Sequence, residues 1–126
     1  MRVLRVRRAL GRIGVRIHQD IVVSSTMLED PADLVVLLPS RTRYEQRGGG
    51  TETNTERRII YSPEIPGPRP GEAQDEWEIP VLAARAVHPE RAAEAFPWRD
   101  THDVRQEIER VCPTYKGIGA LRKKGD

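Results

Sequence analysis

The chain has 126 residues, of which 37% are hydrophobic, and a formal net charge of +2 at neutral pH. This length suffices for one domain, and so small a net charge creates no global field that would attract nucleic acid. A single cysteine, Cys112, excludes an internal disulfide framework and any multi-cysteine metal site within this sequence, and it is typical of a reducing, cytoplasmic setting. No apolar run approaches the roughly 18 residues needed to span a bilayer.

The first residues form a distinct basic segment. Residues 1–12 are rich in arginine and contain no acidic residue, which is typical of an amphipathic basic helix or a disordered arm. A second basic cluster, at residues 122–124, lies near the other end of the sequence. We therefore divide the chain into a basic arm outside the fold at residues 1–12, an α/β segment at residues 13–119 and a basic tail at residues 120–126.

Two strands are expected at the start of the α/β segment. Residues 14–18 alternate apolar and polar side chains, which is typical of a half-buried strand. Residues 34–38 are apolar at every position, which is typical of a strand covered on both faces. Between them, hydroxyl side chains at residues 24–26 favour a short helical turn at residues 27–29, which ends before Pro31. This order predicts a parallel βαβ unit.

A long polar loop at residues 45–58 follows the second strand and contains three consecutive glycines. Glycine adopts positive φ without steric cost, so Gly48, Gly49 and Gly50 allow another group to approach the backbone closely. Composition alone leaves open a flexible surface loop or a loop whose shape serves binding. Residues 58–61 are a third strand candidate, so we predict an α/β fold, a partial doubly wound (Rossmann-like) sheet of about three strands with flanking helices.

Two helices are expected after the proline-rich connector that follows these strands. The first runs from about residue 77 to residue 87, with Asp75 as its N-cap and a buried stripe that includes Val81 and Leu82. A short helix is expected next, at residues 90–96, and it ends before a proline.

The strongest helical pattern of the chain lies at residues 101–112. Thr101 is its expected cap, and Pro113 ends it. Apolar residues recur at helical spacing on the face that we expect to be buried, namely Val104, Ile108, Val111 and Cys112. Cys112 is therefore interpreted as a small core residue.

A series of short motifs follows a fixed order through the middle of the chain. They are Leu38-Pro39, Glu45 with Gly48, Asn54 with Glu56-Arg57-Arg58, Gly71-Glu72-Ala73 and Trp77-Glu78-Ile79. Each motif is weak alone, but their order and spacing resemble one segment of the molybdopterin-dependent oxidoreductases, in particular the formate dehydrogenase-like alpha subunits. The resemblance covers residues 15–119.

The resemblance implies that Gln19, Asp20, Gln46 and Asp75 bind the cofactor. Gln19 and Asp20 lie where a strand gives way to a loop, the place where open α/β sheets bind ligands. Relatives place residues there that touch the guanosine end of a pterin dinucleotide. Gln46 occupies a position where relatives often carry lysine, so it retains hydrogen-bonding capacity but lacks the charge.

These polar residues also have purely structural interpretations. Asp20 would cap the segment that follows it, and Asp75 would cap its helix. Glu45 is expected to organise the glycine turn by accepting backbone N–H bonds. The arginines of residues 54–58 are expected to pair with glutamates rather than with phosphate.

The resemblance also implies a cofactor and partners. The intact enzyme would hold molybdopterin guanine dinucleotide with molybdenum or tungsten, and its other segments can carry an iron–sulfur cluster. We therefore expect a cytoplasmic fragment of such an oxidoreductase. It would contribute part of one dinucleotide pocket, require the remaining domains of the parent enzyme and lack activity alone. No residue is predicted to be catalytic or to ligate a metal.

Two other functions stay open at this point. One is a small non-catalytic binding module whose basic ends contact RNA or a partner protein. The basic stretches contain no aromatic residue to stack on bases, which argues against nucleic acid. The other is a non-catalytic remnant that keeps only the fold.

Overall fold

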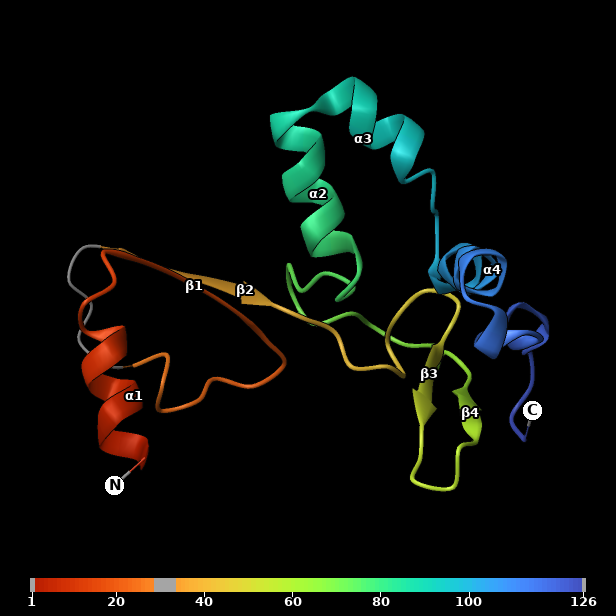
Figure 1. The fold of residues 1–126 in the computed structure, drawn as a ribbon, viewed down its shortest axis with the longest axis horizontal. Helices are drawn as coiled ribbons and strands as arrows, with labels where there is room; N and C mark the ends of the chain where they lie inside the picture. Colours follow the sequence, from red (N-terminus) through yellow and green to blue (C-terminus); the bar gives the residue numbers. More distant parts are fainter. Residues whose placement is uncertain (1, 29–33, 126) are drawn as a thin grey trace.

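The computed structural model describes residues 2–28 and 34–125 (Figure 1). Its elements in chain order are α1 Arg2–Leu10, β1 Val15–Asp20, β2 Leu34–Pro39, β3 Gly50–Thr53, β4 Ile59–Ser62, α2 Glu78–Val87, α3 Pro89–Ala95, α4 Thr101–Val111 and two 3₁₀ turns, η1 Pro113–Tyr115 and η2 Ile118–Ala120. The basic segment at residues 2–10 is thus a helix, one of the two forms predicted for it. Among the described residues, no helix is both long and apolar enough to cross a membrane.

The first sheet consists of β1 and β2, which run parallel with Val15 opposite Leu34 and Asp20 opposite Pro39. Both strands and their parallel relation were predicted from the sequence. The connection begins with a turn in which Met27 donates its backbone N–H to the carbonyl of Ser24 (3.0 Å). The predicted helical turn at residues 27–29 ends outside the described residues.

The apolar second strand is less covered than its composition predicted. Leu34 and Leu37 are exposed, and no other described helix or strand packs extensively against the β1–β2 sheet. The expectation that residues 34–38 are covered on both faces is therefore wrong for this chain. A parallel sheet normally carries helices on both faces, and the described part of the chain supplies none here.

The second sheet is an antiparallel hairpin of β3 and β4, with Gly50 opposite Ser62 and Thr53 opposite Ile59. β4 matches the third predicted strand, but β3 lies inside the stretch interpreted as a loop. The prediction of one partial sheet is wrong for the described residues, which form two separate two-stranded sheets. β3 escaped prediction because its sequence, Gly-Thr-Glu-Thr, has no apolar side chain.

The predicted helices are present, but two of their caps differ from the prediction. Asp100 caps α4, because its side chain accepts the backbone N–H groups of His102 (2.8 Å) and Asp103 (3.1 Å). Thr101 is instead the first helical residue. Asp75 does not cap α2, whose N-cap residue, Trp77, makes no side-chain capping bond. The side chain of Asp75 bonds to Arg41 instead, and that of Thr101 bonds to Gly49.

The buried faces of the helices are also more polar than predicted. Val81 of α2 is buried, but Leu82 is exposed. On α4 the buried residues are Thr101 and Arg105, whereas Val111 is exposed. The predicted stripe of α4 is wrong because Thr101 and Arg105 bond to the backbone of the glycine turn, and the predicted stripe of α2 is wrong at Leu82.

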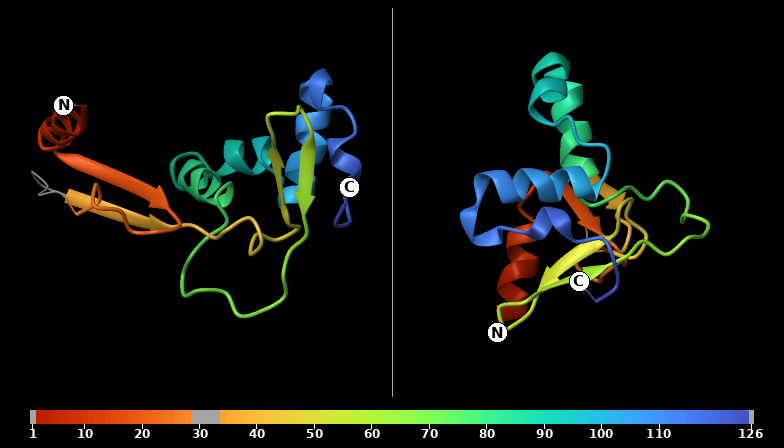
Figure 2. Two further views of the ribbon diagram at one scale, coloured as in Figure 1. Left: turned by 90° about the horizontal axis from the view of Figure 1, so that it is seen from below. Right: turned by 90° about the vertical axis from the view of Figure 1, so that its right-hand side faces the viewer.

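The molecule is extended, with the two sheets at different ends (Figures 1 and 2). The β1–β2 sheet and α1 lie at the amino-terminal end, and α4 lies beside the β3–β4 hairpin at the other end. α2 and α3 lie between these regions, where Trp98 contacts Phe96 and Trp77 with ring centroids 5.2 and 6.4 Å apart. The two basic clusters of the sequence therefore lie at opposite ends of the molecule.

Candidate functional site at the carboxyl end of the parallel strands

The carboxyl ends of β1 and β2 meet a segment from the middle of the chain. Ser40 donates its backbone N–H to the carbonyl of Asp20 (3.0 Å), and Gln74 donates its own to the carbonyl of Pro39 (3.1 Å). The side-chain amide of Gln19 donates to the backbone carbonyl of Glu76 (2.9 Å). Residues 19–20 and 74–76, which are far apart in the sequence, are therefore joined at one edge.

Asp75 is the most deeply buried polar residue of this edge, with its side chain fully enclosed. One carboxylate oxygen accepts from the guanidinium of Arg41 (3.0 Å), and the other accepts from the backbone N–H of Arg47 (3.1 Å). The Nε atom of Arg47 lies 3.6 Å from that second oxygen. Asp75 thus holds two arginines in place instead of capping α2.

Gln46 is buried in the turn that precedes the glycines. Its backbone N–H donates to the carbonyl of Thr42 (3.2 Å), and its own carbonyl accepts from Gly49 (3.0 Å). The neighbouring Glu45 accepts from the backbone N–H (2.9 Å) and the hydroxyl (2.8 Å) of Thr42. These bonds hold the pKa of Glu45 below its usual value and confirm the predicted role of Glu45 in organising the turn.

Two of the hollows at this edge have contrasting linings. One, of about 360 Å³, has an arginine-rich lining: Arg41, Arg47, Arg69, Gln74 and Glu78. The other, of about 440 Å³, is more apolar, and its polar lining residues include His18, Asp20 and Glu72. Gln19 and Asp75 lie at the edge itself, and Gln46 lies in the turn that adjoins Asp75 through Arg47. Asp20 lines the second hollow. Of the four predicted residues, Asp20 alone lines either of these two hollows.

The arginines of the first hollow were not predicted as site residues. Each has a carboxylate partner on one side: Arg41 has Asp75, Arg47 has Glu78 at 2.7 Å, and Arg69 has Glu64. An arginine carries five N–H donors, so these pairs leave donors for a further acceptor. Sequence patterns could not have found the group, because it assembles residues from three separate turns.

Several buried polar atoms at the same edge lack a hydrogen-bond partner. They are Nε2 of His18, Oγ of Ser40, Nε of Arg41 and Nε1 of Trp77. Buried polar atoms in folded proteins are nearly always hydrogen-bonded. Their concentration here fits an edge that a polar ligand or a further protein segment completes.

The residues at the hairpin tip act structurally, as expected from the sequence. The side chain of Asn54 accepts the backbone N–H groups of Glu56 and Arg58, both at 3.0 Å. Glu56 and Arg58 approach each other at 3.6 Å. Their partners lie within the same turn, so this run closes the β3–β4 hairpin.

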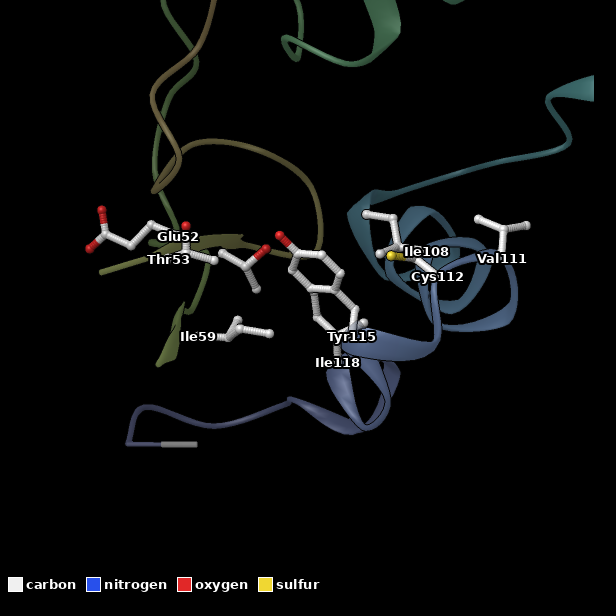
Figure 3. A pocket seen from close by; sticks show the side chains of 9 residues that line it. Glu52, Thr53, Ile59, Ile108, Val111, Cys112, Tyr115 and Ile118 are labelled. Atoms are coloured by element: carbon white, nitrogen blue, oxygen red, sulfur yellow. The ribbon is translucent and has the colours of Figure 1, made fainter. Parts of the chain in front are cut away.

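A third hollow, of about 540 Å³, separates the hairpin from α4 and the final turns (Figure 3). Thr53 and Ile59 face Tyr115 across it, Ile108 comes from α4, and Cys112 directly follows that helix. Cys112 is partly exposed here rather than enclosed in a core. Within residues 2–28 and 34–125, no group of three or more His, Cys, Asp or Glu side chains is placed to hold a metal ion.

Three curated proteins are similar to this chain over most of its length. The alpha subunit of an F420-dependent formate dehydrogenase from Methanocaldococcus jannaschii is 32% identical over 122 residues, which is 96% of this chain and 16% of that protein. A nitrate reductase from a Synechocystis species is 44% identical over 113 residues, 86% of this chain and 15% of that protein. The alpha subunit of F420-dependent formate dehydrogenase 1 from Methanococcus maripaludis is 34% identical over 113 residues, 90% of this chain and 15% of that protein.

The matches cover most of this chain but only a small part of each relative. The chain spans 15–16% of the length of these relatives. No family model and no solved structure matches it.

Proposed function

Because this chain belongs to the molybdopterin-dependent oxidoreductase superfamily, we propose that it forms one wall of a dinucleotide pocket in a larger oxidoreductase. The wall is the carboxyl edge of β1 and β2 together with residues 41–47 and 74–78. Supporting this proposal most directly, the amide of Gln19 bonds to Glu76 beside Asp75, which joins residues predicted separately from distant motifs. The larger sheet of the parent enzyme would be Rossmann-like, with β1 and β2 as two of its strands.

The cofactor would be molybdopterin guanine dinucleotide, and the exposed residues of the edge fit its polar end. Asp20 uses Oδ1 to accept the N–H of Ile21 (2.7 Å), and its other oxygen is available to a guanine edge or a ribose hydroxyl. Gln19 has an amide oxygen that is not used in its bond to Glu76. When bound, the cofactor holds the metal at which substrate is oxidised or reduced, while this chain binds and orients the nucleotide end.

Asp75 and Gln46 would act differently from these exposed residues. Both oxygens of Asp75 are taken by Arg41 and Arg47, so we propose that it positions the arginines that line the first hollow. Gln46 is buried in the turn, and we propose that it fixes the backbone of Arg47 next to it. The arginine-lined hollow offers donors to anionic or carbonyl oxygens of the ligand.

A chimeric enzyme tests this function. The matching segment of the Synechocystis nitrate reductase would be replaced by this chain, and the guanine dinucleotide retained by the purified protein would be measured by extraction and mass spectrometry. Asp20→Ala is expected to weaken retention at least about tenfold, because a hydrogen bond to a charged group contributes about 1.5–3 kcal/mol. The control is Glu90→Ala on α3, an exposed carboxylate remote from the edge. Equal retention by Asp20→Ala, Glu90→Ala and the unmodified chimera would remove Asp20 from the pocket.

The rival function, a module with basic ends that bind RNA, has less support. α1 and residues 122–124 lie at opposite ends of the molecule, so they do not form one continuous basic surface (Figure 1). Nucleic-acid affinity depends on several phosphates being neutralised together. The arrangement therefore favours the oxidoreductase proposal.

A further inference from the structure

Three consecutive carbonyl groups of the glycine turn are bound by two residues of α4. The hydroxyl of Thr101 lies 2.9 Å from the carbonyl oxygen of Arg47 and 2.5 Å from that of Gly49. The backbone N–H of Thr101 also donates to Arg47 (3.0 Å), and Arg105 donates to the carbonyl of Gly48 (3.2 Å). Because Arg105 further donates to the hydroxyl of Thr101 (3.1 Å), the two side chains act together on the turn.

The N–H groups of the same turn are bound from the other side. That of Arg47 donates to Asp75 (3.1 Å), and that of the next residue donates to Glu64 (3.1 Å). The second carboxylate oxygen of Asp75 accepts from Arg41. The second oxygen of Glu64 accepts from Arg69, which lines the arginine-lined hollow together with Arg41 and Arg47. The turn is therefore fixed between α4 and the carboxylates that hold the arginines of the hollow.

The glycine at residue 48 makes the close approach of α4 possible. A Cβ added to Gly48 would lie 2.9 Å from the hydroxyl oxygen of Thr101 and 3.3 Å from Cγ of Asp100. A larger residue would push the first turn of α4 away from the carbonyls that it binds. Without the contact with α4, Arg47 would be followed by three glycines of high backbone freedom. The glycines thus allow α4 to supply the rigidity that they lack.

The two α4 residues are separate from the hollow itself. Neither Thr101 nor Arg105 is among the residues that line it, and they are only 8% and 3% exposed. The side chain of Arg47 does line the hollow and is 49% exposed, with Nη2 bonded to Glu78 (2.7 Å). Any influence of Thr101 and Arg105 on a bound ligand therefore passes through Arg47.

We propose that Thr101 and Arg105 are positioning residues for Arg47, through which α4 sets how strongly the hollow binds the anionic or carbonyl oxygens of a ligand. This inference rests on the proposed function of the hollow as part of a dinucleotide pocket. A guanidinium recognises oxygen atoms through N–H groups in a fixed geometry, and a binding residue on a loop needs support from its surroundings to keep that geometry. Holding Arg47 in place before the ligand arrives also lowers the entropic cost of binding.

Hydrogen exchange tests the positioning without a ligand. The backbone N–H of Arg47, which donates to Asp75, would be followed by NMR in the full 126-residue chain. Thr101→Val removes the hydroxyl, and Arg105→Lys keeps the charge but loses the planar fork of donors. Each variant should speed exchange at Arg47 at least about threefold, as expected for the loss of one hydrogen bond. Thr101→Ser retains the hydroxyl and should restore slow exchange.

The matched control lies at the other end of the same helix. Glu109 accepts the backbone N–H groups of Gly117 (2.9 Å) and Gly119 (3.0 Å), so Glu109→Gln loosens α4 away from the glycine turn. It should leave exchange at Arg47 unchanged. Equal acceleration in Glu109→Gln and Thr101→Val would reflect general loosening of α4 and overturn the inference. Unchanged exchange in both Thr101→Val and Arg105→Lys would overturn it too.

Calorimetric titration with guanosine diphosphate then measures the effect on binding, at a temperature where every variant is folded. Thr101→Val should weaken affinity at least about threefold, whereas Glu109→Gln should not change it. In an Arg47→Met background, Thr101→Val should weaken affinity no further, because a residue that acts through Arg47 has nothing left to position.

The titration separates the inference from the function on which it rests. Equal weakening by Thr101→Val with and without Arg47 would overturn the positioning role. Faster exchange at Arg47 in Thr101→Val and Arg105→Lys, in a chain that does not bind guanosine diphosphate, would support the positioning of Arg47 and contradict the pocket.

Discussion

The two sheets of this molecule differ in how their side chains are covered and bonded. The β1–β2 sheet is built from aliphatic residues, yet it exposes them, and its polar edge carries buried atoms without partners. The β3 strand of the hairpin has no apolar side chain, yet the glycine turn that precedes it is held by hydrogen bonds from Tyr61 of β4 and from Thr101 and Arg105 of α4. An apolar strand sequence therefore does not show that the strand is covered within this chain. The aliphatic sheet leaves apolar side chains exposed, whereas the glycine turn next to the hairpin is bound by residues of β4 and α4.

The polar region owes its closure to a few close contacts. The hydroxyl of Thr101 lies 2.9 Å from the carbonyl of Arg47 and 2.5 Å from that of Gly49. Arg105 donates to the carbonyl of Gly48 (3.2 Å) and lies over the ring of Tyr61, 5.0 Å from its centroid. Burial of this guanidinium lowers the pKa of Arg105, and the neighbouring Tyr61 and Asp100 offset part of that shift.

The largest effect is expected at Gly49. Its φ is +70°, and an added Cβ would lie 2.4 Å from the carbonyl oxygen of Ser62. Gly49→Ala should reduce the free energy of unfolding by about 3–4 kcal/mol, from overpacking and a left-handed backbone. Gly71→Ala is the matched control, because Gly71 also has positive φ (+46°) but open space around it. Urea unfolding measures both, and equal losses would show that the glycine turn is not tightly packed.

A smaller loss is expected when Asp75 is removed. Asp75→Ala leaves the largely enclosed Arg41 guanidinium without its carboxylate, and this should cost about 2–3 kcal/mol of unfolding free energy. Glu78→Ala, which removes a partner of the more exposed Arg47, should cost under about 1 kcal/mol. If the two variants unfold at the same urea concentration, the buried carboxylate of Asp75 contributes no more to the free energy of unfolding than the less buried one of Glu78.

The hydroxyl of Thr101 should contribute less again. Thr101→Val keeps the shape but leaves the carbonyl of Gly49 and a donor of Arg105 unpaired, at a cost of about 1–2 kcal/mol. Thr53→Val is the control, because this hairpin threonine is exposed, with a change within about 0.5 kcal/mol. A neutral Thr101→Val variant would show that α4 does not depend on this bond.

The smallest predicted effect is a pH dependence at Glu45. Its folded pKa lies below the usual 4.5, so the stability from its ionised form is present above that value and is lost as pH falls through the folded pKa. The difference in unfolding midpoint between the chain and its Glu45→Gln variant should therefore be constant above pH 4.5 and vanish in stronger acid. A difference that grows on acidification would reverse the sign and contradict the assignment.

The sequence predicted the local elements better than their assembly. Apolar continuity identified β2, and the prolines and helical spacing located α2, α3 and α4. β3 was missed because its side chains are polar, and the capping residues were misplaced because Asp75 and Thr101 bond to distant turns. Patterns along one chain do not contain such long-range partners.

The candidate site shows the same limit. Gln19, Asp20, Gln46 and Asp75 were found through motifs in a fixed order, and the structure places Gln19 and Asp75 on adjoining walls. The arginine-lined hollow was not foreseen. Its members come from separate turns, and only their pairing with Asp75, Glu78 and Glu64 brings them together.

Amide NMR of the isolated chain during a titration with guanosine diphosphate tests the pocket wall most directly. The account predicts shifts that saturate and are confined to residues 19–20, 41–47 and 74–78, and that are reduced by Asp20→Ala. The absence of shifts at these residues, or shifts confined to the β3–β4 hairpin and α4, would contradict it.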